Sequence, residues 1–211
     1  MADDSFRNEK WNADVARRFE EKLGRARRKA QYLRIQASVL AATDPLVALQ
    51  LLDRYVAMAD TFDHAQAHVD RATALTVLGR IDEAADAYEA ALAREAEFPK
   101  LQTQAYLQLP MLVASKELRA RYGRAIDVLD QNVDRLMFAV DHFLWHASRA
   151  LILVGQGDRG ASVLHAQSAL DAASRNDSGF RYHPTVGLVG DKHYELLEQL
   201  AGMGATSRRK T

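Results

Sequence analysis

The chain has 211 residues, 28 of them basic and 28 acidic, and a hydrophobic fraction of 48%. That fraction is too high for a disordered chain, and the length suits one domain or one short helical array. The chain has no cysteine. Disulfide bonds, thiolate metal ligands and a cysteine nucleophile are therefore excluded together.

The most apolar run, residues 143–154, is shorter than the roughly twenty residues that a membrane span needs. The first ten residues lack the apolar centre of a secretory signal. We therefore expect a cytoplasmic protein with no membrane partner, and the Ala- and Arg-rich composition favours a bacterial source.

Helix-forming residues dominate, with only 4 prolines and 11 glycines to interrupt them, so we expect an all-α protein. Apolar residues recur at three- and four-residue steps from residue 11 to about residue 43, and Asp44-Pro45 is typical of a new helix start. Further helices are predicted over residues 45–56, 65–78, 81–94, 102–118, 124–136, 142–154, 160–174 and 192–201. The expected organisation is a flexible N-terminus (1–10), a single helical domain (11–201) and a flexible tail (202–211).

An internal repeat links the segments 63–79 and 141–157, which align without gaps at an offset of 78 residues. Seven of the seventeen aligned positions are identical. The shared residues are Asp63/Asp141, His64/His142, His68/His146, Arg71/Arg149, Ala72/Ala150, Leu75/Leu153 and Gly79/Gly157. A fixed period of this kind indicates a repeat architecture.

The best unit, residues 65–99, resembles the tetratricopeptide repeat. Its second helix carries the small–aromatic–small spacing of that family at Ala84, Tyr88 and Ala91, after a turn at Gly79. Three weaker units place small residues at Ala48, Ala125 and Ser162. The resemblance covers residues 24–172, with one good repeat and three degenerate ones. It implies a right-handed superhelix of about four antiparallel helix pairs plus a C-terminal capping helix, with these residues in structural roles: His68, Ala72, Gly79, Ala84, Tyr88, Ala91, His146, Ala150 and Gly157.

The resemblance also implies a concave groove lined by the first helix of each pair, around residues 66–76 and 144–151, which suits a peptide or helix of a partner protein. Arg71 and Arg149 replace an apolar residue of the family, and a buried arginine needs a partner. Their partner is either an internal carboxylate, such as Asp70, Glu83 or Asp127, or a carboxylate or phosphate of a bound molecule. The groove residues expected to bind a partner are Arg71, Arg149, Gln66, Thr73 and Trp145.

The irregular segment 175–191 is a second candidate binding surface, because long loops inside compact helical proteins tend to be functional. It contains Phe180, Arg181, Tyr182 and His183, which are residue types common at interfaces. The alternative, compatible with binding, is that Phe180 and Tyr182 hold the loop over the end of the helical stack.

No pattern in the sequence predicts catalysis, a metal or a cofactor. The pairs His64/His68 and His142/His146 have the spacing of metal ligands on a helix, but they lie two repeats apart and packing roles are favoured for them. Gly155-Gln-Gly157-Asp-Arg-Gly160 matches a dinucleotide-binding pattern but follows a predicted helix rather than a strand.

We therefore expect a non-enzymatic scaffold that binds a protein or peptide, with homo-oligomers left open. Two alternatives remain. The same scaffold could neutralise a toxin, as immunity proteins and antitoxins do. A nucleic-acid-binding regulator would use the basic face of residues 17–34, although Glu20 and Glu21 interrupt that face and argue against nucleic acid.

Overall fold

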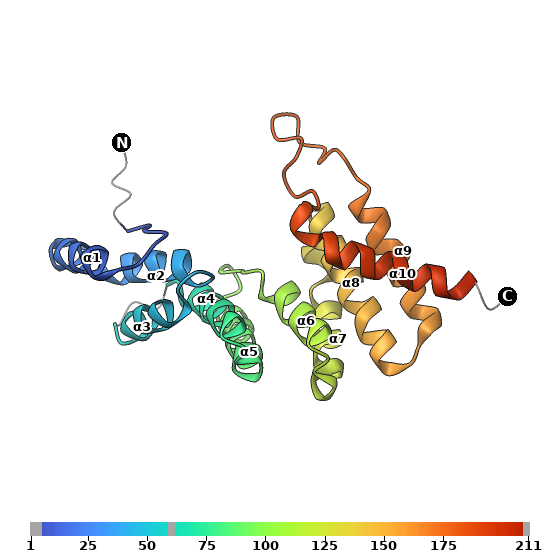
Figure 1. The fold of residues 1–211 in the computed structure, drawn as a ribbon, viewed down its shortest axis with the longest axis horizontal. Coiled ribbons are helices and arrows are strands. Elements are labelled where there is room, and N and C mark those ends of the chain that lie inside the picture. The colour runs from blue at the N-terminus through green and yellow to red at the C-terminus, as the bar shows by residue number, and fades with distance from the viewer. Residues whose placement is uncertain (1–5, 59–61, 209–211) are drawn as a thin grey trace. The chain divides into compact units, whose positions relative to one another are not determined.

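The computed structural model describes residues 6–58 and 62–208, with the side chains of residues 204–208 excepted. Over these residues the protein is all-α, with about ten helices packed in adjacent antiparallel pairs and no strand (Figure 1). The all-α prediction is confirmed. The chain forms two compact units, residues 1–105 and residues 106–211.

Unit 1 contains helices α1 to α5, in which α2 packs against α3 and α4 packs against α5. Their bounds are α1 (Ala13–Arg25), α2 (Lys29–Leu40), α3 (Pro45–Val56), α4 (His64–Val77) and α5 (Ile81–Glu97). The core is built from side chains with almost no exposed surface, among them Phe19, Leu33, Leu40, Leu52 and Tyr55. Burial of apolar surface of this kind is the main source of stability in such a helical layer.

The helical pattern predicted over residues 11 to about 43 corresponds to two helices, with a break between α1 and α2. Ala26 has an extended backbone (ψ 141°), and its N–H closes the end of α1 on the Leu23 carbonyl. The apolar spacing continues through the break, from Leu23 to Ala30, which explains why periodicity alone missed it. The break lets α2 pack against α3 while Phe19 and Leu23 of α1 remain buried.

The described part of the N-terminal segment makes specific contacts with unit 1. The Phe6 ring stacks on Tyr32 with 3.9 Å between ring centroids, and the Asn8 side chain donates to Oε1 of the buried Gln36. Residues 1–5 of the predicted flexible N-terminus lie outside the described residues.

Unit 2 contains helices α6 to α10 and three 3-10 turns. Their bounds are α6 (Ala105–Ser115), η1 (Arg119–Arg121), α7 (Tyr122–Gln131), η2 (Val133–Arg135), α8 (Ala139–Gln156), α9 (Arg159–Ala173), η3 (Asp191–His193) and α10 (Tyr194–Arg208). Helices α8, α9 and α10 share a core around Phe143, Ala147, Ala169 and Leu200. The last helix continues to Arg208 instead of ending near Ala201, so the expected tail 202–211 is helical over its described part.

The repeat glycines end the first helix of two pairs. Gly79 and Gly157 both have a left-handed backbone, with φ of 73° and 89°, a conformation that glycine adopts without the steric cost a side chain brings. Ala72, Ala84 and Ala150 are fully buried where paired helices approach. The glycine and Ala72/Ala150 therefore have the same structural role in both segments.

No described helix is both long enough and apolar enough to cross a membrane.

Candidate functional site

A pocket in unit 1 lies between α3, α4 and α5 and includes Arg71, the first of the predicted partner-binding residues. Its volume is about 570 Å³. Leu46, Leu49 and Leu75 give it apolar walls, and Arg71 and Arg80 give it positive charges. The remaining lining residues are Gln50, Asp53, His68, Glu83, Asp86, Ala87 and Ala90. Both helices of one pair and the second helix of the preceding pair thus contribute, whereas the sequence predicted a groove of first helices alone.

Arg71 donates to Asp53 on α3, across the pocket wall. The internal carboxylates predicted for this role were Asp70 and Glu83. Asp70 instead pairs with Arg34, and Glu83 pairs with Arg80. The Asp53 carboxylate is largely exposed, so Arg71 is held at the surface and not in the core.

His68 lies beside Arg71 on the pocket wall. Burial lowers the pKa of His68 below its ordinary value, and the nearby Arg71 cation lowers it further. The imidazole is therefore mainly neutral at pH 7 and can donate one hydrogen bond and accept another.

Gln66 and Thr73, the other predicted residues of this helix, belong to a different face of α4. The Gln66 amide donates to Asp70 at 3.0 Å, and the Thr73 hydroxyl donates to the Val69 carbonyl at 3.1 Å. Neither residue lines the pocket around Arg71. The sequence therefore grouped two faces of one helix into a single surface.

In unit 2, Arg149 repeats the arrangement of Arg71. Its guanidinium donates to Asp130 on α7 and lies over the Trp145 ring, 4.3 Å from the ring centroid. The predicted internal partner was Asp127, one turn earlier. Burial lowers the pKa of Arg149, but a guanidinium remains charged at any physiological pH.

Trp145 and two histidines form an aromatic cluster next to Arg149. The indole N–H donates to the Leu129 carbonyl at 2.9 Å, and the rings of His146 and His165 lie 4.8 and 5.8 Å from the indole. The Nδ1 atoms of His146 and His165 are 3.0 Å apart, so one imidazole donates and the other accepts. Burial, together with the neighbouring His165 and His142, lowers the pKa of His146 to about 4.

The histidine pairs considered as metal ligands separate into different contacts. His64 packs edge-on against Tyr55, and His146 bonds to His165 on the neighbouring helix. Within the described part of the chain, no three His, Cys, Asp or Glu side chains are grouped so that they could hold a metal ion.

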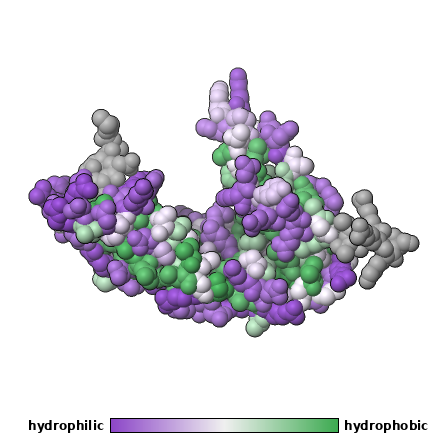
Figure 2. Space-filling model, viewed as in Figure 1, coloured by the Kyte–Doolittle hydropathy of each residue, from purple (hydrophilic) through white to green (hydrophobic). Residues whose placement is uncertain are grey.

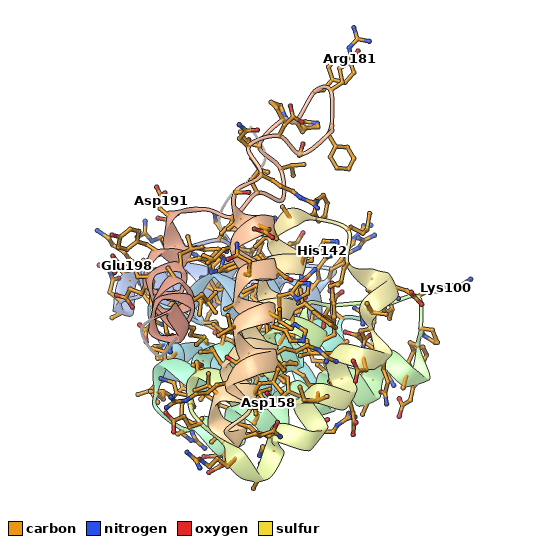
Figure 3. All side chains as sticks on the ribbon, turned by 90° about the vertical axis from the view of Figure 1, so that its right-hand side faces the viewer. Lys100, His142, Asp158, Arg181, Asp191 and Glu198 are labelled. Atoms are coloured by element: carbon orange, nitrogen blue, oxygen red, sulfur yellow. The ribbon has the colours of Figure 1, made fainter. Side chains whose placement is uncertain are left out.

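The 175–191 segment projects from unit 2 between α9 and η3, and Arg181 lies at its outer end (Figure 3). Its base is attached to α8. The Gly187 carbonyl accepts from Val140 N–H at 2.9 Å, and a side chain at Gly187 would overlap Phe138. Val189 packs on the core of unit 2. This base is the part of the segment that closes over the helices.

The tip of this segment, residues 178–184, is closed on itself by hydrogen bonds. Ser178 N–H donates to the Pro184 carbonyl, the Ser178 hydroxyl donates to the His183 carbonyl, and His183 N–H donates to the Phe180 carbonyl. Tyr182 is 79% exposed and Phe180 is 48% exposed, with Phe180 6.0 Å from Phe138. Of the two rings predicted to hold the loop down, Phe180 touches the unit, whereas Tyr182 contacts only Arg181 among the described aromatic and cation–ring contacts.

Figure 2 shows this projection as mainly hydrophilic at its outer end, with apolar surface at its base. The exposed aromatic rings thus stand within a polar tip, which keeps a free loop soluble while offering apolar contact area.

Part of the basic face of residues 17–34 is neutralised internally. Arg17 pairs with Asp14 and Glu21, and Arg34 pairs with Asp63 and Asp70. The cations that remain at the junction of α1 and α2 are Arg25, Arg27, Arg28 and Lys29, all exposed. The glycine pattern 155–160 spans the end of α8 and the start of α9, a helix–turn–helix connection and not a strand–turn–helix.

Three residues of these sites were missed from the sequence: Asp53, Asp130 and His165. A signal for the two aspartates exists, because each follows the small residue of its helix by five positions (Ala48 and Ala125). His165 has no such repeat signal, since Ala87 occupies the equivalent position.

No family model, curated protein or solved structure matches the chain.

Proposed function

We propose that this protein is a non-enzymatic, tetratricopeptide-type scaffold of the cytoplasm that binds a partner protein, and that the loop tip 178–184 is one of its contact surfaces. The observation that carries the proposal is the combination of closure and exposure at this tip. Its backbone is fixed by internal hydrogen bonds, while Tyr182 and Phe180 face solvent.

A closed loop binds with a smaller loss of conformational entropy than a disordered one, because its backbone is already ordered before contact. Tyrosine and arginine supply much of the energy at protein interfaces, through contact area and directed hydrogen bonds. Arg181 lies 5.4 Å from the Tyr182 ring centroid, at the outer end of the projection (Figure 3). A partner surface with an apolar recess and a carboxylate would fit this tip.

The repeat features support the scaffold part of the proposal. Glycines with left-handed backbones at Gly79 and Gly157 and buried alanines between paired helices are the packing devices that the tetratricopeptide family uses. The extended superhelix and its concave groove belong to the proposal as well.

The experiment is affinity capture with the full chain, comparing wild type with the double variant Phe180→Ala, Tyr182→Ala by quantitative mass spectrometry. A matched control replaces two other exposed apolar residues of unit 2, Met137→Ala and Leu164→Ala. The proposal requires a protein that wild type and the control retain and that the loop variant loses at least about tenfold, the effect of about 1.4 kcal/mol.

Equal capture by all three proteins would reject the loop as a contact surface. Retention of nucleic acid instead of any specific protein would reject the scaffold assignment. It would indicate that the exposed cations at the α1–α2 junction bind nucleic acid. Circular dichroism of each variant establishes that the fold is intact before the comparison is made.

A further inference from the structure

The Arg71 and Arg149 sites share one arrangement of residues, which we call the arginine device. In each copy an arginine pairs with an aspartate of the preceding helix, and a histidine lies three residues before the arginine. The residues of the two copies can therefore be aligned. An offset of 78 residues relates α4 to α8 and α5 to α9, as His68/His146 and Gly79/Gly157 show. An offset of 77 relates α3 to α7, because Asp53 and Asp130 are both paired with the equivalent arginine.

In unit 2 the device holds an aromatic ring of its own chain. The Trp145 indole lies under the Arg149 guanidinium and next to the rings of His146 and His165, and its N–H bonds to a backbone carbonyl of α7. Helices α7, α8 and α9 thus each contribute a contact to one indole. A cation over an indole face is the most favourable of the cation–ring pairs.

In unit 1 the same device lacks the ring. The residues equivalent to Trp145 and His165 are Ala67 and Ala87, so two large side chains are replaced by methyl groups. Ala87 lines the pocket of about 570 Å³, together with His68, Arg71 and Asp53. Three of these residues are the equivalents of His165, His146 and Arg149, which surround the indole in unit 2.

Unit 1 has no ring of its own to fill this pocket. None of its described Phe, Tyr or Trp side chains lines it, and the undescribed residues 1–5 and 59–61 include none of these residue types. The pocket nevertheless keeps the groups that would hold a ring: a guanidinium, a neutral imidazole and the apolar side chains of Leu49 and Leu75.

We infer that the α3–α4–α5 pocket binds an aromatic side chain of a partner peptide, with its ring under the Arg71 guanidinium as Trp145 lies under Arg149. The inference rests on the proposed function, since the ring belongs to the partner that the scaffold binds. It specifies the chemistry of that partner: a peptide with an exposed tryptophan or another aromatic residue.

The exchange of residues between the two units supplies the test. The probe is N-acetyl-tryptophanamide, titrated into the purified full chain and followed by protein NMR shifts and saturation transfer, with N-acetyl-leucinamide as the apolar control. Wild type should bind one equivalent of the tryptophan probe, at least about fivefold more tightly than the leucine probe, because leucine offers no ring face to the cation.

Ala87→His and Ala67→Trp copy the residues of unit 2 into unit 1. Each should weaken binding of the probe at least about tenfold, because the side chain then fills the pocket. Ala67 is buried, so Ala67→Trp also needs space within the unit. Ala87→His, on the pocket wall, tests the inference even where Ala67→Trp does not fold.

The reverse change is Trp145→Ala, which empties the site in unit 2 and should add a second equivalent of bound probe. Thr73→Ala, on another face of α4, should change nothing. The inference is overturned by any of three results: equal binding of the two probes, unchanged binding to a folded Ala87→His variant, or a single equivalent bound to a folded Trp145→Ala variant.

Light scattering adds a control for self-association. A concentration-dependent dimer that Phe180→Ala, Tyr182→Ala abolishes and Ala87→His also abolishes would make a second copy the occupant, and would overturn the assignment to a partner. If affinity capture shows no role for the loop, the tryptophan probe can still bind to the pocket. If the probe does not bind, the loop can still be a contact surface. The two proposals therefore fail separately.

Discussion

Acidification should destabilise the protein through His146, because the folded state opposes its protonation. The Nδ1 atoms of His146 and His165 share one hydrogen bond at 3.0 Å between two neutral rings, and protonation of both rings would place two positive charges side by side. His142 on the same helix also lowers the pKa of His146, and Arg149 lowers the pKa of His165. Burial is the largest cause of the lowered pKa, about 4 against an ordinary 6.5.

The sign follows from proton binding. Between pH 6.5 and about 4 the unfolded chain binds a proton at this residue and the folded chain does not, so the free energy of unfolding rises with pH across this window. The contribution is fully present above pH 6.5 and is lost as the pH falls towards 4. The two pKa values correspond to at most about 3.4 kcal/mol. Because the ring is only half-buried, screening by water reduces this to about 1–2 kcal/mol.

The assay is urea denaturation of wild type and His146→Gln at half-unit steps from pH 7.0 to 4.5. Wild type should lose about 1 kcal/mol more than the variant between pH 7 and pH 5. His183→Gln, a change of an exposed loop histidine, serves as the control and should follow wild type. If His146→Gln and wild type lose stability in parallel, the hydrogen-bonded imidazole pair does not set the acid limit and the reasoning is refuted.

Three further predictions concern stability. Tyr88→Ala should lower the free energy of unfolding by about 3–5 kcal/mol, because the ring is buried. Tyr182→Ala should lower it by less than about 0.5 kcal/mol, because that ring is exposed. Equal losses in thermal or chemical denaturation would make the loop tip a structural cap. Gly155→Ala should cost about 1–3 kcal/mol, because the added carbon would lie 2.5 Å from the hydroxyl of Tyr122, and a neutral result in calorimetry would show that this ring moves freely. Arg34→Met should lower the free energy of unfolding by about 3 kcal/mol in urea denaturation, because it removes the cation that pairs with the buried Asp70 carboxylate. A loss under about 1 kcal/mol would contradict that account.

Helix positions were predictable where apolar spacing and start or stop residues agreed. Asp44 does precede α3, which begins at Pro45, and Gly79 and Gly157 follow the ends of α4 and α8. The break at Ala26 was not predictable from periodicity, because the seven-residue step from Leu23 to Ala30 suits a continuous helix. Gly24 lies just before the break, but glycine within a helical pattern does not by itself end a helix.

The candidate site was only partly predictable, because residues of one helix point in different directions and contact different neighbouring helices. The spacing places Gln66, Thr73 and Arg71 within three turns of α4, yet Arg71 faces α3 and Gln66 bonds back to Asp70. The choice of Asp53 over Asp70 depends on which helix packs beside α4. In a single sequence, only the internal repeat indicates which helix packs beside α4.

The internal repeat separates what the fold needs from what a site can vary. The aspartate–arginine pair, the left-handed glycine and the buried small residues occur in both units, so they are common to the two repeats. The residues that differ around the arginine are Ala67 against Trp145 and Ala87 against His165, and in unit 2 these differences close the device with the chain's own ring. In unit 1 Asp53 pairs with the arginine, although none of the described Phe, Tyr or Trp side chains lines the pocket beside it. An arginine that is oriented over an open, partly apolar pocket forms a preorganised site for an aromatic ring of another molecule. This preorganised site connects the internal repeat to the binding role that we propose.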